Sequence, residues 1–160
     1  MRETTLCYLS KDNCYLMLHR VKKKNDANHE KWIGVGGGML AGETPEECAI
    51  REVWEETGYT MHSPLYRGVV RFYSDIYEDE VMHLFTATKF SGEEIDCDEG
   101  VLAWVPVKDV PSLPGWEGDR IFLSLLAKGA PFFHLSLYYK GDKLERALLE
   151  EKELPLPYQE

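Results

Sequence analysis

One segment of the chain, Gly36–Tyr59, reads GGGMLAGETPEECAIREVWEETGY and combines a strong helix signal with a cluster of acidic residues. Thr44, Pro45 and Glu47 are residue types preferred at the N-cap, the first helical position and the third helical position. Gly58 suits the left-handed conformation that commonly ends a helix. The segment therefore predicts a helix that begins at Pro45 and ends just before Gly58.

The predicted helix has two chemically different sides. One side is apolar, and we expect it to pack; it carries Ala49, Ile50, Val53 and Trp54. The other side carries the carboxylates of Glu52, Glu55 and Glu56. Like charges at these spacings destabilise a helix by roughly 0.2–0.5 kcal/mol per pair, and a solvated acidic face is the simplest interpretation. Clustered oxygen ligands beside glycines that let the backbone approach closely favour instead a hard divalent cation, Mg²⁺ or Mn²⁺.

The distribution of charge excludes some classes of partner. The 160 residues include 28 acidic and 18 basic ones, a formal net charge of −10. Half of it lies in residues 43–56. Residues 142–160, which we expect to form an acidic C-terminal tail that is solvated or loosely packed, add −3. This charge would repel a phosphate backbone, so we expect no nucleic-acid polymer as partner. No uncharged stretch exceeds 11 residues, whereas a membrane span needs about 18 apolar ones, so we expect no membrane.

Length and hydrophobic pattern predict one domain over residues 1–160. A hydrophobic content of 44% is sufficient for a single packed core. Strands are predicted at 4–9, 14–18, 32–35, 65–73, 81–90, 101–107 and 132–139, the last being the final strand. The apolar spacing after Trp116 predicts a second helix that ends near Gly129, and the polar segment 20–31 predicts a loop. The predicted fold class is α+β, with a mixed β-sheet and two helices.

The spacing of residues around the acidic helix resembles a known motif. Gly37, then Glu43 after five residues, then REVWEETGY at 51–59 after seven more, is similar to the Nudix hydrolase signature Gx₅Ex₇REUxEExGU, in which U is a bulky aliphatic residue. Tyr59 departs from it at the last position. The resemblance implies an α/β/α sandwich with a mixed β-sheet, in which the motif forms a loop–helix–loop that holds divalent cations.

The resemblance also implies roles for individual residues. The metal ligands would be Glu52, Glu55, Glu56, the carbonyl of Gly36 and, in the loop before the 101–107 strand, Glu99. Glu43 and Arg51 would hold the loop against the helix. The bound ion would be Mg²⁺, for which Mn²⁺ can substitute, and Glu52 or Glu55 would orient or deprotonate the attacking water. Nudix enzymes of this kind hydrolyse nucleoside diphosphate linkages, whose negative charge the metal neutralises.

Outside the motif, the chain resembles the MutT-type 8-oxo-dGTP diphosphatases. The matching pieces are Lys31–Gly37, Trp104–Pro106 and Trp116–Asp119. In the mammalian type a tryptophan stacks on the base and acids bind its edge, roles that fall here on Trp116 and Asp119. The implied substrate-binding set also includes Thr5, His19, Ile33, Val35, Gly36, Gly37 and Gly38. Three positions depart from the mammalian pattern: Ile33 replaces an asparagine, Gly38 a lysine and Gly118 an aspartate.

The expected function is Mg²⁺-dependent hydrolysis of oxidised purine nucleoside triphosphates, such as 8-oxo-dGTP, to a monophosphate and pyrophosphate, which prevents DNA damage. The alternatives are a Nudix hydrolase of a nucleotide sugar, dinucleoside polyphosphate or RNA 5′ end, and a binding module that has lost catalysis. The basic run Lys22–Lys24 is either a solvated surface or a loop that meets the triphosphate. Four cysteines without metal-ligand spacing, and no apparent leader after Met1, predict a cytoplasmic protein. Nothing in the sequence sets the oligomeric state.

Overall fold

A computed structural model describes residues 1–22 and 26–159. In this part of the chain, nine strands form one mixed sheet in the order β11-β10-β9-β5-β6-β1-β2-β3, with β8 paired to the free side of β2. The strands are β1 (Arg2–Lys11), β2 (Cys14–His19), β3 (Trp32–Ile33), β5 (Leu65–Ser74), β6 (Glu80–Ala87), β8 (Val101–Pro106), β9 (Phe133–Lys140), β10 (Lys143–Leu149) and β11 (Lys152–Glu153). A second, two-stranded sheet joins β4 (Tyr59–Met61) to β7 (Phe90–Gly92).

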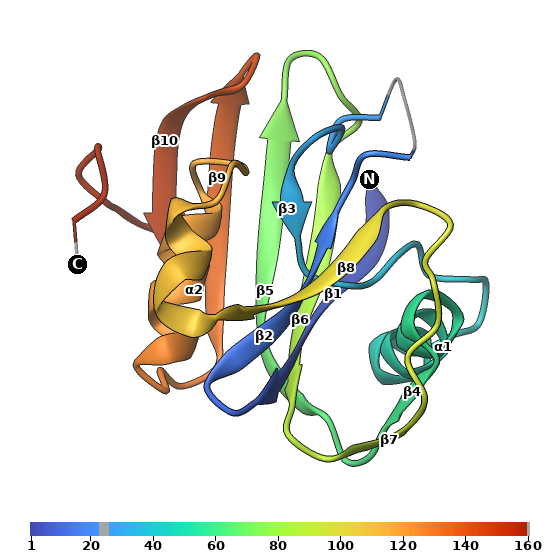
Figure 1. Cartoon of the computed structure of the whole chain (residues 1–160). Helices are drawn as coiled ribbons and strands as arrows, with labels where there is room; N and C mark the ends of the chain where they lie inside the picture. The colour runs from blue at the N-terminus through green and yellow to red at the C-terminus, as the bar shows by residue number, and fades with distance from the viewer. Residues whose placement is uncertain (23–25, 160) are drawn as a thin grey trace.

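Two helices cover opposite faces of the sheet. Helix α1 (Pro45–Thr57) lies beside β4 and β7, whereas α2 (Asp119–Ala127) lies against β9 at the other end of the molecule (Figure 1). Alternation along β1 divides the core accordingly: Cys7 packs in the cluster that contains Val53 of α1, and Tyr8 packs in the cluster that contains Phe122 of α2. The predicted α/β/α sandwich with a mixed sheet is therefore confirmed.

Most predicted elements are present, with shifted ends. Asp12 and Asn13, both at positive φ, form the turn that joins the strands predicted at 4–9 and 14–18. The strand predicted at 32–35 is regular only at β3, the one predicted at 81–90 divides into β6 and β7, and a 3₁₀ helix (Val107–Ser112) follows β8. The predicted loop 20–31 includes residues 23–25, which lie outside the described residues. No helix in the described part is both long and apolar enough to cross a membrane.

The prediction of a solvated tail over residues 142–160 is wrong. Strand β10 pairs antiparallel with β9 and buries Leu144 and Ala147 in the core under α2, and it also pairs with β11. Leu154, Leu156 and Tyr158 pack against the same core. Consequently β9 is an internal strand and not the last one. In β10, exposed charged residues alternate with buried apolar ones, as in a strand with one face on the core. The net charge of the segment does not reveal this alternation.

Candidate active site

The glycine segment runs along β1 as an irregular extra strand. The amide of Thr5 donates to the carbonyl of Gly37 at 2.9 Å, and Cys7 and Val35 exchange two backbone hydrogen bonds of 2.6 and 2.9 Å. This pairing requires small residues, because a Cβ built on Gly36 would lie 2.0 Å from the carbonyl oxygen of Thr5. The segment is thereby fixed between the central strand and the start of α1.

Helix α1 begins and ends where the sequence predicts. The Thr44 hydroxyl accepts from the Glu47 amide at 3.1 Å, the Glu47 carboxylate accepts from the Thr44 amide at 2.9 Å, and Gly58 ends the helix at φ 84°. At the facing loop, a Cβ on Gly37 would lie 2.5 Å from the nearer carboxylate oxygen of Glu52. The glycine therefore leaves room for this side chain between loop and helix.

Arg51 ties the glycine loop to α1. Its Nε and Nη2 donate to the two carboxylate oxygens of Glu43, at 2.7 and 3.0 Å, and Nη2 also donates to the carbonyl of Gly38 at 3.1 Å. Its Nη1 donates to Glu52 at 2.9 Å and to Glu55 at 3.2 Å. The guanidinium lowers the pKa of Glu43 to about 2, so this pair stays charged throughout the neutral range. We call Arg51 with these four partners the arginine clamp.

Glu56 is the buried carboxylate of the site. Glu56 is only 8% exposed to solvent, and its Oε2 has no hydrogen-bond partner among the described residues. Burial, with the nearby Glu99 and Glu52 carboxylates, raises the pKa of Glu56 to about 9. The predicted division of the helix is wrong here, because Glu56 is buried whereas Trp54, predicted to pack, is 58% exposed.

Glu99 is held by an arginine that the sequence analysis did not single out. Arg20 is buried, and it donates through Nη1 to Glu99 at 2.8 Å and through Nη2 to Asp26 at 2.7 Å. The loops before β3 and before β8 are thus joined across the site. The sequence does not set Arg20 apart, because it stands at the start of a polar run that includes Lys22–Lys24.

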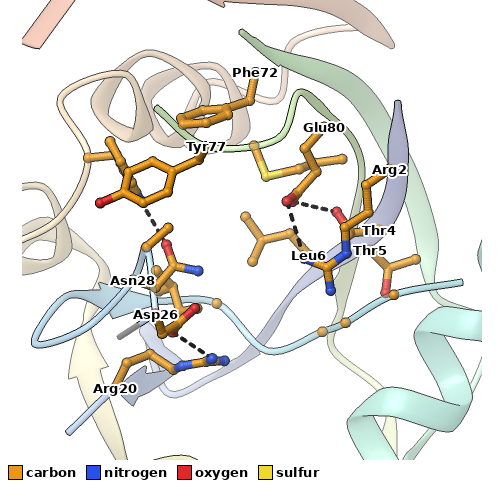
Figure 2. Close-up of a pocket in the computed structure, with 18 of the residues that line it drawn as sticks. Arg2, Thr4, Thr5, Leu6, Arg20, Asp26, Asn28, Phe72, Tyr77 and Glu80 are labelled. Carbon is orange, nitrogen blue, oxygen red and sulfur yellow. Dashed lines mark hydrogen bonds and ion pairs between the residues drawn. The ribbon is translucent and has the colours of Figure 1, made fainter. Parts of the chain in front are cut away.

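One cavity of about 370 Å³ connects these groups (Figure 2). At one end it is lined by Gly36, Gly37, Gly38, Glu52, Glu56, Glu99 and Arg20. At the other end it is lined by Phe72, Tyr77, Trp116, Asp119 and Tyr139. Thr5, Leu6 and Ile33 lie along it. The acidic helix and the tryptophan segment, far apart in sequence, therefore share one space.

The acidic end suits a divalent cation, although it is not a preformed cage. Within residues 1–22 and 26–159, no three acidic, histidine or cysteine side chains converge as a ready cation site. The carboxylate of Glu52 accepts a hydrogen bond from Arg51, and that of Glu99 accepts one from Arg20. Glu55 does not line the cavity. The unpartnered buried oxygen of Glu56 nevertheless lies among carboxylates, which is the donor set that Mg²⁺ prefers. Glu52, Glu56 and Glu99 would supply the ligand oxygens, with Glu56 in its ionised form.

Trp116 forms the wall of the other end. It is 8% exposed, and its indole Nε1 donates to the Asn28 side chain at 2.7 Å. Phe72 and Tyr139 meet its ring edge-on, with centroids 5.1 and 5.0 Å away, and the Lys31 ammonium lies 4.5 Å from the ring centroid. Such an aromatic cluster offers a base a stacking surface.

Asp119 begins α2 beside this tryptophan. Burial raises the pKa of the Asp119 carboxyl to about 7. A hydrogen bond with the Trp116 backbone and the positive charge of Lys31 lower this pKa, but by less. Both protonation states are therefore populated near neutral pH, and the group can donate or accept a hydrogen bond. Among the carboxylates that line the cavity, it is the one nearest in sequence to Trp116.

A family model of the NUDIX domain matches residues 2–126 of the chain. The chain belongs to the Nudix family. It is 31% identical over 133 residues to the oxidized purine nucleoside triphosphate hydrolase of Danio rerio, which covers 82% of this chain and 85% of that protein. It is 30% identical over 144 residues to the uncharacterized Nudix hydrolase YvcI of Bacillus subtilis, with 87% of each chain covered. The crystal structure of a mutator MutT protein from Bacillus halodurans superimposes with a TM-score of 0.83 at 26% identity, covering 95% of this chain and 99% of that one.

Two predicted substrate residues lie elsewhere in this Nudix domain. Among the described residues that line the cavity, neither His19 nor Val35 is found. His19 pairs across the strands with Trp32, and the two rings stack 4.3 Å apart. Val35 is fully buried in the core under α1. Because side chains alternate along a strand, Arg20 enters the cavity in place of its neighbour His19.

The structure explains two departures from the mammalian pattern. A Cβ on Gly118 would lie 2.5 Å from Leu137 and 2.7 Å from the Tyr139 hydroxyl, to which the Gly118 amide donates, so an aspartate does not fit there. A Cβ on Gly38 would lie 3.4 Å from the Arg2 guanidinium, which places a cation near the point where the mammalian type has a lysine. Lys23 and Lys24 of the predicted basic run lie outside the described residues, and the Lys22 ammonium donates to the carbonyl of Cys97 at 2.8 Å.

Substituting Gly37→Ala tests the fit between loop and helix. The new methyl group would overlap the Glu52 carboxylate, so we expect Mg²⁺ affinity, measured by calorimetric titration, to fall at least tenfold with the fold retained. Gly38→Ala is the matched control, because its Cβ meets only the end of the flexible Arg2 side chain. Equal Mg²⁺ affinity of the two variants would contradict the assignment of Glu52.

The raised pKa of Glu56 predicts how the metal-free protein responds to pH. Its carboxyl titrates near 4.5 when unfolded and near 9 when folded, so the folded state binds more protons between these values. The free energy of unfolding of the metal-free protein should therefore decrease as the pH rises through this window. In Glu56→Gln, which mimics the protonated carboxyl, this decrease should be reduced. Thermal unfolding in the presence of a chelator at a series of pH values measures it, and identical profiles for the two proteins would refute the effect.

Proposed function

We propose that this Nudix hydrolase cleaves nucleoside triphosphates to a nucleoside monophosphate and pyrophosphate in the presence of Mg²⁺, with oxidised purine nucleotides such as 8-oxo-dGTP as preferred substrates. The observation that carries the proposal is the single cavity that joins the acidic end to the aromatic wall of Trp116. A nucleotide needs both ends, since its phosphates require cations and its base requires a stacking surface. The similarity to the oxidized purine nucleoside triphosphate hydrolase of Danio rerio supports the choice of substrate.

Residues of the acidic end would hold the ion. Glu52, Glu56 and Glu99 line the cavity, with the backbone of Gly36 beside them. Bound Mg²⁺ would neutralise phosphoryl charge and lower the pKa of water. Glu52, with a side chain 15% exposed inside the cavity, is better placed to orient the attacking water than Glu55, which is 49% exposed and lies outside it. Glu55 would then assist through the arginine clamp.

Asp119 would distinguish the oxidised base. Guanine presents an acceptor at N7, whereas 8-oxoguanine presents an N–H donor there. A carboxylate accepts from that donor and is repelled by the acceptor, a difference of the order of 1–3 kcal/mol for a buried polar group. Because the pKa of Asp119 is about 7, the ionised form that favours the oxidised base grows as the pH rises above neutrality.

A second candidate is hydrolysis of a nucleoside diphosphate sugar such as ADP-ribose. The ADP-ribose pyrophosphatase of Bacillus subtilis is 40% identical, but over only 70 residues, which are 41% of this chain and 37% of that protein. This stretch is too short to carry the base pocket as well as the motif. The triphosphate proposal therefore rests on more of the chain.

Comparing 8-oxo-dGTP with dGTP tests the proposed selectivity. We expect kcat/KM for 8-oxo-dGTP to exceed that for dGTP by about tenfold or more, because one charged hydrogen bond separates them. In Asp119→Asn the ratio should fall toward one. Products are identified as monophosphate and pyrophosphate, and ADP-ribose serves as the competing substrate. A ratio near one in the wild type would remove the selectivity for oxidised purines, and turnover of ADP-ribose alone would favour the second candidate.

A further inference from the structure

A carboxylate that the proposed mechanism does not use lies midway along the cavity. Glu80 is paired with Phe72 of β5 on one side and with Arg2 of β1 on the other, so the three residues form one row across the sheet. Neighbouring strands lie about 4.8 Å apart. Glu80 is therefore one strand away from the aromatic wall and one strand away from β1, along which the glycine segment runs. Figure 2 shows it between Phe72 on one side and Thr4 on the other.

The hydrogen bonds of Glu80 leave it able to accept more. Its Oε2 accepts from the Thr4 hydroxyl at 2.8 Å, while Oε1 lies 3.6 Å from the Arg2 guanidinium, which is beyond hydrogen-bond range. Its side chain is 25% exposed, and that of Arg2 is 54% exposed. Burial raises the pKa of the Glu80 carboxyl, consistent with a group that is poorly solvated. Thr4 therefore fixes Oε2, whereas Oε1, which is ion-paired with Arg2 but not hydrogen-bonded to it, can accept a hydrogen bond from a ligand.

The position of Glu80 limits the part of a nucleotide that it can meet. Phosphate oxygens only accept hydrogen bonds and carry negative charge, so a carboxylate repels them. The base belongs at Phe72 and Trp116, and Asp119 lines the same cavity close to Trp116 in sequence. A nucleotide that spans the cavity therefore brings its sugar, which carries O–H donors, past Glu80.

We propose that Glu80 is a specificity-determining residue of this Nudix hydrolase that accepts a hydrogen bond from a sugar hydroxyl of the bound nucleotide. The inference rests on the proposed function, because it requires that a nucleotide spans the cavity. Glu80 would make the middle of the cavity selective for the sugar of the nucleotide, independently of the base. The hydroxyl is that of C3′ or C2′, both of which are donors on the same face of the sugar.

Matched nucleotide pairs test this role. The 3′-hydroxyl is probed by kcat/KM for dGTP against 2′,3′-dideoxy-GTP, and the 2′-hydroxyl by GTP against dGTP. We expect the wild type to prefer the hydroxyl-bearing member of one pair by about tenfold or more, as a hydrogen bond to a charged group predicts. In Glu80→Gln this preference should decrease several-fold, while the dGTP to dITP ratio, which reports on the base amino group, stays unchanged.

Two further variants separate the contact from charge and folding. Glu145→Gln removes the same charge at an exposed position of β10, outside the cavity lining, and should leave both sugar ratios as in the wild type. Thr4→Val removes the hydroxyl that orients Glu80 and should shift the same ratio in the same direction, by less. Thermal unfolding confirms that each variant is folded.

The outcomes distinguish this inference from the proposed function. If the wild type hydrolyses none of these nucleotides, the proposed function fails. If it hydrolyses them and Glu80→Gln changes both members of each pair equally, or changes the dGTP to dITP ratio instead, the role of Glu80 is refuted. If Glu145→Gln has the same effect as Glu80→Gln, the cause is overall charge and the role is likewise refuted.

Discussion

The site depends on one charged contact, the bidentate pair between Arg51 and Glu43. Glu43 follows the glycine loop and Arg51 lies in the second turn of α1, so their two hydrogen bonds of 2.7 and 3.0 Å close the loop onto the helix. The same guanidinium reaches the carbonyl of Gly38 and the carboxylate of Glu52. A planar fork of donors can make these contacts together, whereas a lysine cannot. Without it, neither the loop carbonyls nor the carboxylates would have fixed places.

Two arginines offset part of the negative charge at the acidic end of the cavity. Arg51 compensates Glu43 and Glu52, and Arg20 compensates Glu99 and Asp26. The remaining buried carboxyl, Glu56, has a pKa of about 9 and so carries a proton at neutral pH. The residues that would hold a cation are Glu56, in its ionised form, together with Glu52 and Glu99, each of which is paired with an arginine. Metal affinity is thus set by the arginines as well as by the carboxylates.

Local signals in the sequence predict local structure well. The caps of α1 and the turn at Asp12 and Asn13 are formed by residues within a few positions of each other, and each was predictable. The motif also predicted that Glu43 and Arg51 would meet, although which atoms join them is visible only in the structure.

The errors all concern contacts between distant segments. The burial of Leu144 depends on β9 and α2, which the composition of the tail does not reveal. Helical periodicity predicted that Trp54 would be buried and Glu56 exposed. The reverse holds, because segments far away in the sequence form the cavity that buries Glu56. We predicted that His19 lines the substrate pocket, but its neighbour Arg20 does so instead. The pairing of His19 with Trp32 in β3 directs its side chain to the other face of the sheet. Glu80 stands just before the strand predicted at 81–90, and no site residue was predicted there.

The central claim is that the acidic end of the cavity becomes a phosphate site only when it holds a cation. Calorimetric titration with a non-hydrolysable nucleoside triphosphate analogue, in millimolar Mg²⁺ and then in excess chelator, tests it most directly. Binding should be clear with Mg²⁺ and at least a hundredfold weaker without it, since uncompensated carboxylates repel the phosphates. Equal affinity in the two conditions would contradict the account, because the carboxylates would then not be the groups that the triphosphate meets.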